Sequence, residues 1–352
     1  MKKILFCGFF FIAISLTAQE FQTEKMDSLF FLLEKHDKAM GSLSVYSKGE
    51  RVYQKSIGYA NVDDKIKATD TTQYRIGSVS KIFTATLVMQ LIEEGKLSLE
   101  TKLSEFYPEL PNSDQITIEQ LLRHESGLFD IIKSPDFKEW MVEKRSKDEL
   151  LSKIKQNGSI FSPGEKREYS NTNYIILTFI LEDIENEDFA DILEKRILKP
   201  LQLNNTYYGG KNPEISESSS YEKKENAWEK PSHIHLSIPR GAGGIISTPD
   251  DLNKFINGLF EGKLVNENSL ETMKKEPGIG MTAIPVFREE EMIGHMGGMD
   301  AFQSLLVYMP KQDMTFAYSF NGIDYSYKEI VMGIFNILLN KEYDLPQLES
   351  LD

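Results

Sequence analysis

The sequence predicts a mixed α/β fold in which both ends of the chain form a sheet-containing lobe and the middle forms an all-helical lobe. Strand-like segments lie near the two ends, whereas the segments between them show the apolar spacing of helices. A chain that leaves its sheet, builds helices and then returns gives a discontinuous α/β lobe with a helical insertion. We therefore expect one domain over residues 21–345, with the α/β lobe at about 21–77 and 240–345 and the helical lobe at about 78–239. A cleft between two such lobes is a favoured site for a ligand.

The N-terminal elements are predicted to be a helix and a hairpin. Apolar residues spaced three and four apart predict a helix over residues 21–40. Two strand-like runs, 42–46 and 51–57, then flank Lys48-Gly49-Glu50, a turn sequence typical of an antiparallel hairpin.

The middle of the chain is predicted to be helical. Its most apolar helix runs from Ser78 to Glu94 and is stopped by Gly95. The polar segment 213–230 contains three consecutive serines and mixed charges, so we expect a solvated loop there. Further helices are predicted at residues 118–124, 147–156, 171–185 and 189–198.

The last third of the chain is predicted to return to the sheet. Thr248, Pro249 and Asp251 have the pattern of a helix start, with a hydroxyl cap, a proline and an acid in the first turn. An apolar helix over residues 327–339 closes the chain. Between these helices, strand-like runs are predicted at residues 291–295, 302–309 and 314–320.

The charge balance argues against nucleic acid as a partner. The chain has 352 residues, with 40 Lys and Arg against 54 Asp and Glu, which gives a formal net charge of −14. Such a chain repels polyanions and anionic membrane surfaces. We therefore expect a small-molecule or peptide substrate, and the sequence predicts no particular oligomeric state.

Residues 1–18 have the layout of a secretory signal peptide. Lys2 and Lys3 precede an apolar run from Ile4 to Leu16, and cleavage is expected near Ala18. The run is shorter than the ~20 residues that span a bilayer, so no stable membrane span is expected after processing. The protein is thus expected to be exported, periplasmic or secreted. Its single cysteine lies within this segment, so the mature chain would have no disulfide.

A serine–lysine pair opens the most apolar helix. Ser78 and Lys81 are three residues apart and so share one helix face. A serine hydroxyl becomes a nucleophile when a neighbour takes its proton, and a lysine amine can do this if its surroundings keep it neutral. By itself Ser78 would be assigned as a helix cap. The same spacing recurs at Ser152/Lys155 and Ser220/Lys223, where we expect solvated surface.

Two further motifs add groups for proton transfer and substrate binding. Tyr169-Ser170-Asn171 supplies a phenol that can relay a proton and an amide that can hold a carbonyl. His295-Met296-Gly297-Gly298 follows a strand-like run, and its glycines can bring a backbone N–H group to a developing oxyanion.

The other histidines are given no catalytic role. His124 is expected to be packed and hydrogen-bonded within the structure. His233 and His235 could lie on one strand face near the cleft mouth, but the sequence offers no third ligand beside them. We therefore expect neither a metal ion nor a cofactor.

The order of these motifs resembles the serine β-lactamase and penicillin-binding family. The resemblance is closest to the branch that contains class C β-lactamases, D-Ala-D-Ala carboxypeptidases, D-aminopeptidases and related esterases, of peptidase family S12 type. It implies an antiparallel sheet flanked by helices with an inserted helical lobe. The similar segments are residues 74–81, 121–128, 163–174, 242–252 and 294–298.

The resemblance implies a role for each motif residue. Ser78 would form the acyl-enzyme, and Lys81 would be the base for acylation, with Tyr169 sharing the proton transfer. Asn171 would orient the substrate amide, and the N–H groups of Ser78 and Gly298 would form the oxyanion hole. The residues implied in substrate binding are Asn171, His295, Gly297 and Gly298.

The third motif departs from the β-lactamase pattern. β-Lactamases of this branch carry Lys-Thr-Gly where this chain has His295-Met296-Gly297. Members with His-x-Gly are mostly peptidases and esterases, so the resemblance favours a peptide of D-amino-acid type or an ester as substrate, of cell-wall origin or otherwise, over a β-lactam. The alternative is a penicillin-binding sensor that is acylated without turnover. Because the pKa of free histidine is about 6.5, we expect His295 to be mostly neutral at neutral pH, so that neutral esters or amides are preferred over substrates with a free carboxylate. The relative kcat/KM for anionic substrates is expected to improve as the pH falls from about 8.5 to 5.5.

Overall fold

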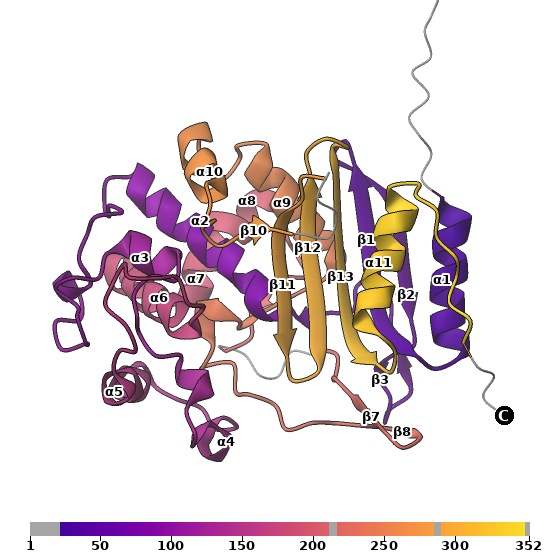
Figure 1. Ribbon diagram of the computed structural model, residues 1–352, viewed down its shortest axis with the longest axis horizontal. Helices are drawn as coiled ribbons and strands as arrows, with labels where there is room; N and C mark the ends of the chain where they lie inside the picture. Colours follow the sequence, from indigo (N-terminus) through magenta and orange to yellow (C-terminus); the bar gives the residue numbers. More distant parts are fainter. Residues whose placement is uncertain (1–21, 211–216, 285–289, 349–352) are drawn as a thin grey trace, which may run out of the picture.

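A six-stranded antiparallel sheet forms the centre of the computed structural model, which describes residues 22–210, 217–284 and 290–348 (Figure 1). The strand order is β10-β11-β12-β13-β1-β2, so the N-terminal hairpin pairs with the C-terminal strands through β1 and β13. The sheet therefore joins the two ends of the chain, as the sequence predicts. The strands are β1 (Ala39–Ser47), β2 (Glu50–Ile57), β10 (Thr282–Ala283), β11 (Ile293–Met299), β12 (Phe302–Met309) and β13 (Met314–Ile323).

Two helices from the chain ends cover one face of the sheet. These are α1 (Thr23–Lys35) and α11 (Tyr327–Leu338), which lie beside each other on the right of Figure 1. Because helices cover both faces, β1, which lies between β13 and β2, is buried along almost its whole length. The core of this layer includes the fully buried side chains of Phe30, Leu33, Phe316, Phe320 and Ile334.

The opposite face of the sheet carries α9 (Pro249–Phe260), and behind it the helices from the middle of the chain. As expected, Thr248 caps α9, because its hydroxyl accepts a hydrogen bond from Asp251 N at 3.2 Å. α2 is apolar on nearly all sides and lies at the centre of this layer, where Phe83 stacks on Phe255 with ring centroids 3.6 Å apart. The helices are α2 (Ser80–Glu93), α3 (Ile118–Leu122), α4 (Phe137–Trp140), α5 (Lys147–Asn157), α6 (Asn171–Glu185), α7 (Phe189–Leu193) and α8 (Lys199–Leu201).

A second, three-stranded sheet was not expected from the sequence. It has the order β5-β9-β6, and it holds the segment that leads into the Ser78 turn beside the segment that follows Ala242. Its strands are only two or three residues long, so they show no alternating pattern that a sequence analysis could detect. They are β5 (Tyr74–Arg75), β6 (Tyr207–Tyr208) and β9 (Ile245–Ser247).

The first helix is shorter than predicted. It ends at Lys35, and Asp37 adopts a left-handed backbone conformation with φ of 52°. The N–H of Lys38 then bonds back to Leu33 O at 2.7 Å, which closes the helix end. Residues 39–40, predicted as helix, therefore belong to β1.

The prediction of a solvated loop over residues 213–230 is only partly right for the described residues 217–230, because residues 222–230 are mostly exposed whereas residues 217–221 are largely buried. Ser218, Ser220 and Tyr221 are buried, and Tyr221 N donates to Asn321 O of β13 at 2.7 Å. Polar composition alone misled the prediction, because these side chains are satisfied by hydrogen bonds inside the protein. The segment also forms the hairpin β7 (Glu222–Lys224) and β8 (Ala227–Glu229).

Three further short strands and helices lie in the described residues. They are β3 (Tyr59–Asn61), β4 (Ile66–Lys67) and α10 (Glu267–Lys274). Across residues 22–348, apart from the two undescribed gaps, no helix is long and apolar enough to span a membrane. The expected signal peptide, residues 1–18, lies outside the described residues.

Candidate active site

Ser78 lies at the junction between a tight turn and the central helix. Gly77–Val79 form a single 3-10 turn that continues directly into α2. Gly77 has φ of +50°, a left-handed conformation that glycine adopts without the steric cost of a side chain. The turn leaves Ser78 half-buried and brings its Oγ within 3.1 Å of the Lys81 Nζ, so the structure brings the predicted pair together.

The Lys81 amine is completely buried and has three oxygen partners. Its Nζ lies 3.1 Å from Ser78 Oγ, 2.8 Å from Asn171 Oδ1 and 2.7 Å from Ala242 O. Burial disfavours the charged ammonium and lowers the pKa of Lys81 from 10.5 to about 7, although the charge of Asp130 opposes the shift. A substantial fraction of this lysine is therefore neutral at physiological pH.

The phenol of Tyr169 reaches the same serine from the other side. Its Oη donates a hydrogen bond to Ser78 Oγ at 2.7 Å, and Lys81 Nζ lies 4.9 Å from the centre of its ring. The side chain is 38% exposed, so the phenol stands between the buried amine and solvent. Desolvation raises the pKa of Tyr169 above its ordinary value of 10.0, so the phenol keeps its proton at neutral pH.

Asn171, the first residue of α6, connects Lys81 to an acid that the sequence analysis missed. Its Oδ1 accepts from Lys81, and its Nδ2 donates to Asp130 Oδ2 at 3.0 Å. Since a carboxylate can only accept, Asp130 fixes the orientation of the amide and turns the amide oxygen towards the lysine. Burial raises the pKa of Asp130, while its hydrogen bonds from Asn171 oppose that shift. A lone acid in the apolar stretch Leu128–Ile132 is the one sequence signal that could have identified it.

His124 is packed behind Tyr169, as the sequence predicts. The two rings lie with centroids 4.4 Å apart, and the imidazole is only 5% exposed. Its Nδ1 accepts from Ser170 N at 3.3 Å, which requires an unprotonated Nδ1. Burial and the nearby Lys81 hold the pKa of His124 well below its ordinary value of 6.5. His124 is thus a neutral support for the Tyr169 ring.

His295 is neutral as well, and this corrects the expected pH dependence. Its Nδ1 donates to the carbonyl oxygen of Met296 at 2.5 Å, and its ring centroid lies 6.4 Å from that of Tyr169. Burial, with the charge of Lys81 as a smaller cause, lowers the pKa of His295 from 6.5 to about 4. The imidazole therefore does not change its charge between about pH 5.5 and 8.5, contrary to the expectation from free histidine.

The two glycines of the third motif lie on β11, which extends beyond the predicted 291–295 run to Met299. A Cβ atom on Gly297 would lie 2.0 Å from Ile76 O, and a Cβ on Gly77 would lie 2.9 Å from Gly298 N. The strand is thus in direct backbone contact with the turn that carries Ser78.

This contact predicts different effects for two neighbouring substitutions. Gly297→Ala should destabilise the protein by about 1–3 kcal/mol, because its Cβ would overlap backbone that cannot move aside. Gly298→Ala is the matched control, since its Cβ would meet only the Gln303 side chain at 3.4 Å or more. Urea unfolding of both variants tests this contact, and equal stabilities would contradict it.

The two other Ser-x-x-Lys pairs lie in different environments. Ser152 and Lys155 are exposed on α5, as predicted. Ser220 is fully buried, which corrects the prediction of solvated surface there. Its hydroxyl donates to Asp300 O and lies 3.2 Å from His233 Nε2. Ser220 is therefore a structural serine.

The described residues offer no metal centre. No group of three His, Cys, Asp or Glu side chains among them could hold a metal ion. His235 Nδ1 lies 2.8 Å from Ser237 Oγ, and the ring of His233 lies 6.4 Å from that of Phe302.

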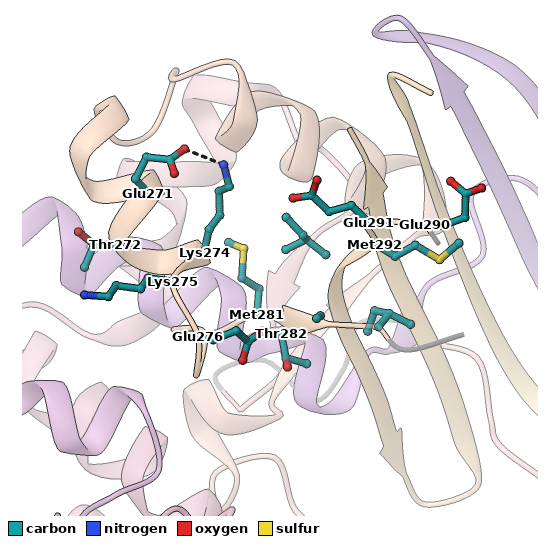
Figure 2. Close-up of a pocket in the computed structure, with 13 residues that line it drawn as sticks. Glu271, Thr272, Lys274, Lys275, Glu276, Met281, Thr282, Glu290, Glu291 and Met292 are labelled. Atoms are coloured by element: carbon teal, nitrogen blue, oxygen red, sulfur yellow. Dashed lines mark hydrogen bonds and ion pairs between the residues drawn. The ribbon is translucent and has the colours of Figure 1, made fainter. Parts of the chain in front are cut away.

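A pocket beside α10 is separate from the Ser78 cluster. It has a volume of about 830 Å³. Figure 2 shows its lining residues on α10, β10 and the start of β11. Its walls carry both charges, with Lys274 paired to Glu271 at 2.6 Å. Ser78, Lys81 and Tyr169 do not line it, although Ile293 at its edge lies two residues before His295 on β11.

Comparisons with known proteins show what the chain is similar to. Residues 27–327 match a protein-family model described as Beta-lactamase. A putative penicillin-binding protein, PbpX of Bacillus subtilis, is 29% identical over 234 residues, which cover 66% of this chain and 58% of that protein. A teichoic acid D-alanine hydrolase of Staphylococcus aureus is 27% identical over 241 residues, which cover 68% of this chain and 58% of the relative. The matched regions therefore span less than two thirds of these relatives.

The fold also matches that of a solved enzyme. The D-amino acid amidase of Ochrobactrum anthropi, solved in complex with D-phenylalanine, superposes with a TM-score of 0.81. The match covers 90% of this chain and 99% of the amidase, at 23% sequence identity.

Proposed function

The chain belongs to the beta-lactamase family, and from that premise we propose that it is a serine hydrolase that forms an acyl-enzyme at Ser78 with D-amino-acid esters or amides. The observation that carries the proposal is the buried Lys81 amine beside the Ser78 hydroxyl, with its pKa lowered to about 7. A lysine of ordinary pKa would be charged and could not take a proton.

The hydrogen bonds around Lys81 suit a neutral base. A neutral amine has two N–H donors and one lone pair, and the two oxygens of Asn171 and Ala242 take the two donors. The lone pair then faces Ser78 Oγ, which passes its proton to Nζ as it attacks the substrate carbonyl carbon. The Asp130–Asn171 pair supports this role because it keeps the amide oxygen, not its NH₂ group, on the lysine.

Tyr169 and two backbone amides complete the proposed mechanism. A protonated phenol in contact with Ser78 can donate its proton to the leaving nitrogen or oxygen, and the proton gained by Lys81 can replace it. The N–H groups of Ser78 and Gly298 would bind the oxyanion, and the close contact between Gly77 and Gly298 N supports this assignment.

The substrate class follows from the relatives and from His295. The hydrolase and the amidase both carry the name of a D-amino acid in their activity. Esters and amides of D-amino acids have no free carboxylate at the scissile end, so they need no cation at the third motif. A neutral His295 fits such substrates, whereas a Lys-Thr-Gly motif supplies a fixed positive charge.

A substrate panel tests the proposal. It contains D-alanine and D-phenylalanine amides with their L-enantiomers, a D-alanine ester, a D-Ala-D-Ala peptide and a chromogenic cephalosporin. We expect hydrolysis of the D-amino-acid amide or ester to exceed that of the cephalosporin and of the L-enantiomers. Rapid cephalosporin turnover with inert D-amino-acid substrates would contradict the proposal.

The lowered pKa of Lys81 predicts the pH profile. Since only the neutral amine is a base, kcat/KM for an uncharged ester should rise with pH and then level off. It should reach half its maximum at about pH 7, the lowered pKa of Lys81. The measurement is kcat/KM for p-nitrophenyl acetate from about pH 5.5 to 9. A rise that shows no levelling by about pH 9, as expected if the pKa of Lys81 stayed at its ordinary 10.5, would show that burial does not activate Lys81.

His295→Lys should change the preference for substrate charge. A lysine would add a charge-assisted hydrogen bond, so kcat/KM for an anionic substrate relative to a matched neutral one should rise by roughly 1–2 kcal/mol, about 5- to 30-fold. In the wild type the same ratio should stay flat between about pH 5.5 and 8.5, because His295 remains neutral. An unchanged ratio in the variant would mean that this position does not contact the charged end of the substrate.

We also propose that the domain divides into the two lobes expected from the sequence. A separate proposal is that residues 1–18 direct export and are then removed. N-terminal sequencing of the protein recovered from outside the cytoplasm tests the removal of residues 1–18. A retained Met1 would contradict it.

A further inference from the structure

We propose that Arg75 and Asp300 are positioning residues that hold the Gly297-Gly298 end of β11 against the Ser78 turn, and so set the geometry of the oxyanion hole. The inference rests on the proposed function, because it concerns the site where the oxyanion would form. Neither side chain is proposed to touch the substrate.

The pair joins the two backbone segments that carry the proposed oxyanion donors. Arg75 lies on β5, three residues before Ser78, and Asp300 lies in the β11–β12 turn, two residues after Gly298. Arg75 Nη1 lies 3.0 Å from Asp300 Oδ2, and the two side chains are 9% and 3% exposed. An ion pair so well shielded from water is weakened little by salt and restricts both segments.

A third segment closes the arrangement. Arg75 Nη1 also donates to Ile234 O at 2.9 Å, and both carboxylate oxygens of Asp300 accept from Ile234 N at 3.1 Å. The two charged groups thus bind the donor and the acceptor of one residue. Sideways movement of either side chain would break several hydrogen bonds at once.

The turn that contains Asp300 has a backbone conformation that is unfavourable for its residues. Asp300 has φ of 51° and Ala301 has φ of 67°, and both are left-handed conformations that non-glycine residues rarely adopt. Such conformations persist when the surroundings enforce them. The contacts of Asp300 with Arg75 and Ile234 supply that constraint.

Gly298 is the position most sensitive to the constraint. Gly297 is already held, because it packs on Ile76 O and faces Ser304, whose hydroxyl donates to the same oxygen at 2.7 Å. Gly298 lies one residue closer to the turn, where it packs against Gly77, and the Arg75–Asp300 ion pair links the strand to the Ser78 segment two residues further on. Loss of the ion pair would free the Gly298 N–H while leaving the base of the strand in place.

The charge of Asp300 depends on its partner. Burial raises the pKa of this carboxyl to about 6, and Arg75 and the N–H of Ile234 oppose that shift. An asparagine would keep the shape and a hydrogen bond to Ile234 N but would lose the attraction to Arg75. Asp300→Asn is therefore the most informative variant.

The test compares Asp300→Asn with Glu217→Gln. Glu217 is the second carboxylate on Arg75, 2.6 Å from Nη2, but it does not belong to the β11–β12 hairpin. For a chromogenic D-phenylalanine anilide we expect Asp300→Asn to lower kcat at least about tenfold with KM changed less than about twofold, because an oxyanion donor acts mainly on the transition state. Glu217→Gln should keep kcat within about twofold.

A second readout separates positioning from stability. Phenylboronic acid forms a tetrahedral adduct with an active serine, and one of its oxygens takes the place of the oxyanion. Its inhibition constant should rise in Asp300→Asn by about the factor by which kcat falls. Both quantities are measured well below the unfolding temperature of each variant.

The possible results separate failure of the positioning role from failure of the proposed function. A folded Asp300→Asn protein with a lower melting temperature but unchanged kcat and boronate inhibition would overturn the positioning role. If that variant does not fold, Arg75→Lys takes its place, because one ammonium cannot reproduce the fork that binds Asp300 and Glu217. Unchanged kcat and inhibition in Arg75→Lys would overturn it equally. Activity retained by Ser78→Ala would instead refute the proposed function itself.

Discussion

Replacement of Ser78 by alanine is expected to abolish hydrolysis while the protein stays folded. Its Oγ is the atom on which Lys81 Nζ and Tyr169 Oη converge, at 3.1 and 2.7 Å. Without that atom no acyl-enzyme can form, and we expect kcat to fall by at least about 10⁴-fold. Alanine is compatible with the start of a helix, so circular dichroism and the melting temperature should stay close to those of the wild type. The measurement is turnover of the best substrate from the panel.

Ser152→Ala is the matched control for this prediction. Ser152 has the same Ser-x-x-Lys spacing but is exposed on α5, so its loss should leave kcat and stability unchanged. Ser220→Ala cannot serve as a control, because its buried hydroxyl bonds to the carbonyl of Asp300. Turnover near the wild-type level in Ser78→Ala, or a large loss in Ser152→Ala, would show that the nucleophile lies elsewhere.

Lys81→Ala is expected to cost almost as much as the loss of the serine. The variant removes the base and leaves the oxygens of Asn171 and Ala242 without their buried donor. We expect a loss of about 10³- to 10⁴-fold in kcat, the upper part of the range for general-base catalysis. Single-turnover kinetics with a p-nitrophenyl ester should place the loss in the acylation step.

The double variant Ser78→Ala/Lys81→Ala tests whether the two residues act together. If Lys81 serves only to activate Ser78, the double variant should be no less active than Ser78→Ala. A loss equal to the sum of both single effects would mean that they act independently. Lys81→Met serves as the folding control, because it keeps most of the side-chain volume at this buried position.

The cluster around Ser78 could be predicted from the sequence because its residues stand in short local patterns. Ser78 and Lys81 share a helix face by spacing alone, and the apolar run that follows them makes α2 the central helix. The hairpin of β1 and β2 was predictable from the turn residues between two strand-like runs. The closure of the sheet by β1 and β13 followed from strand material at both ends of the chain.

The rest depends on contacts between distant segments, which no local pattern reveals. Asp130 can orient the Asn171 amide only because α6 places Asn171 beside it, and the two residues are 41 positions apart in the chain. Ser220 was predicted to be exposed because its sequence neighbours are polar. It is buried because the turn between β11 and β12 places the Asp300 carbonyl against it. The pKa of His295 depends on burial and on Lys81, so its ordinary value gave the wrong pH range.

Intact-mass spectrometry of the protein mixed with a D-amino-acid ester tests the central claim most directly. We predict a transient mass increase equal to the D-aminoacyl group, mapped to the peptide that contains Ser78, followed by return to the free protein as substrate is consumed. An adduct on another residue would contradict the account. The account would also be contradicted by substrate turnover with no adduct in rapidly quenched samples of the wild type and of slow-turnover variants. An adduct on Ser78 that persists for hours would contradict its hydrolase function and identify the protein as a sensor that is acylated without turnover.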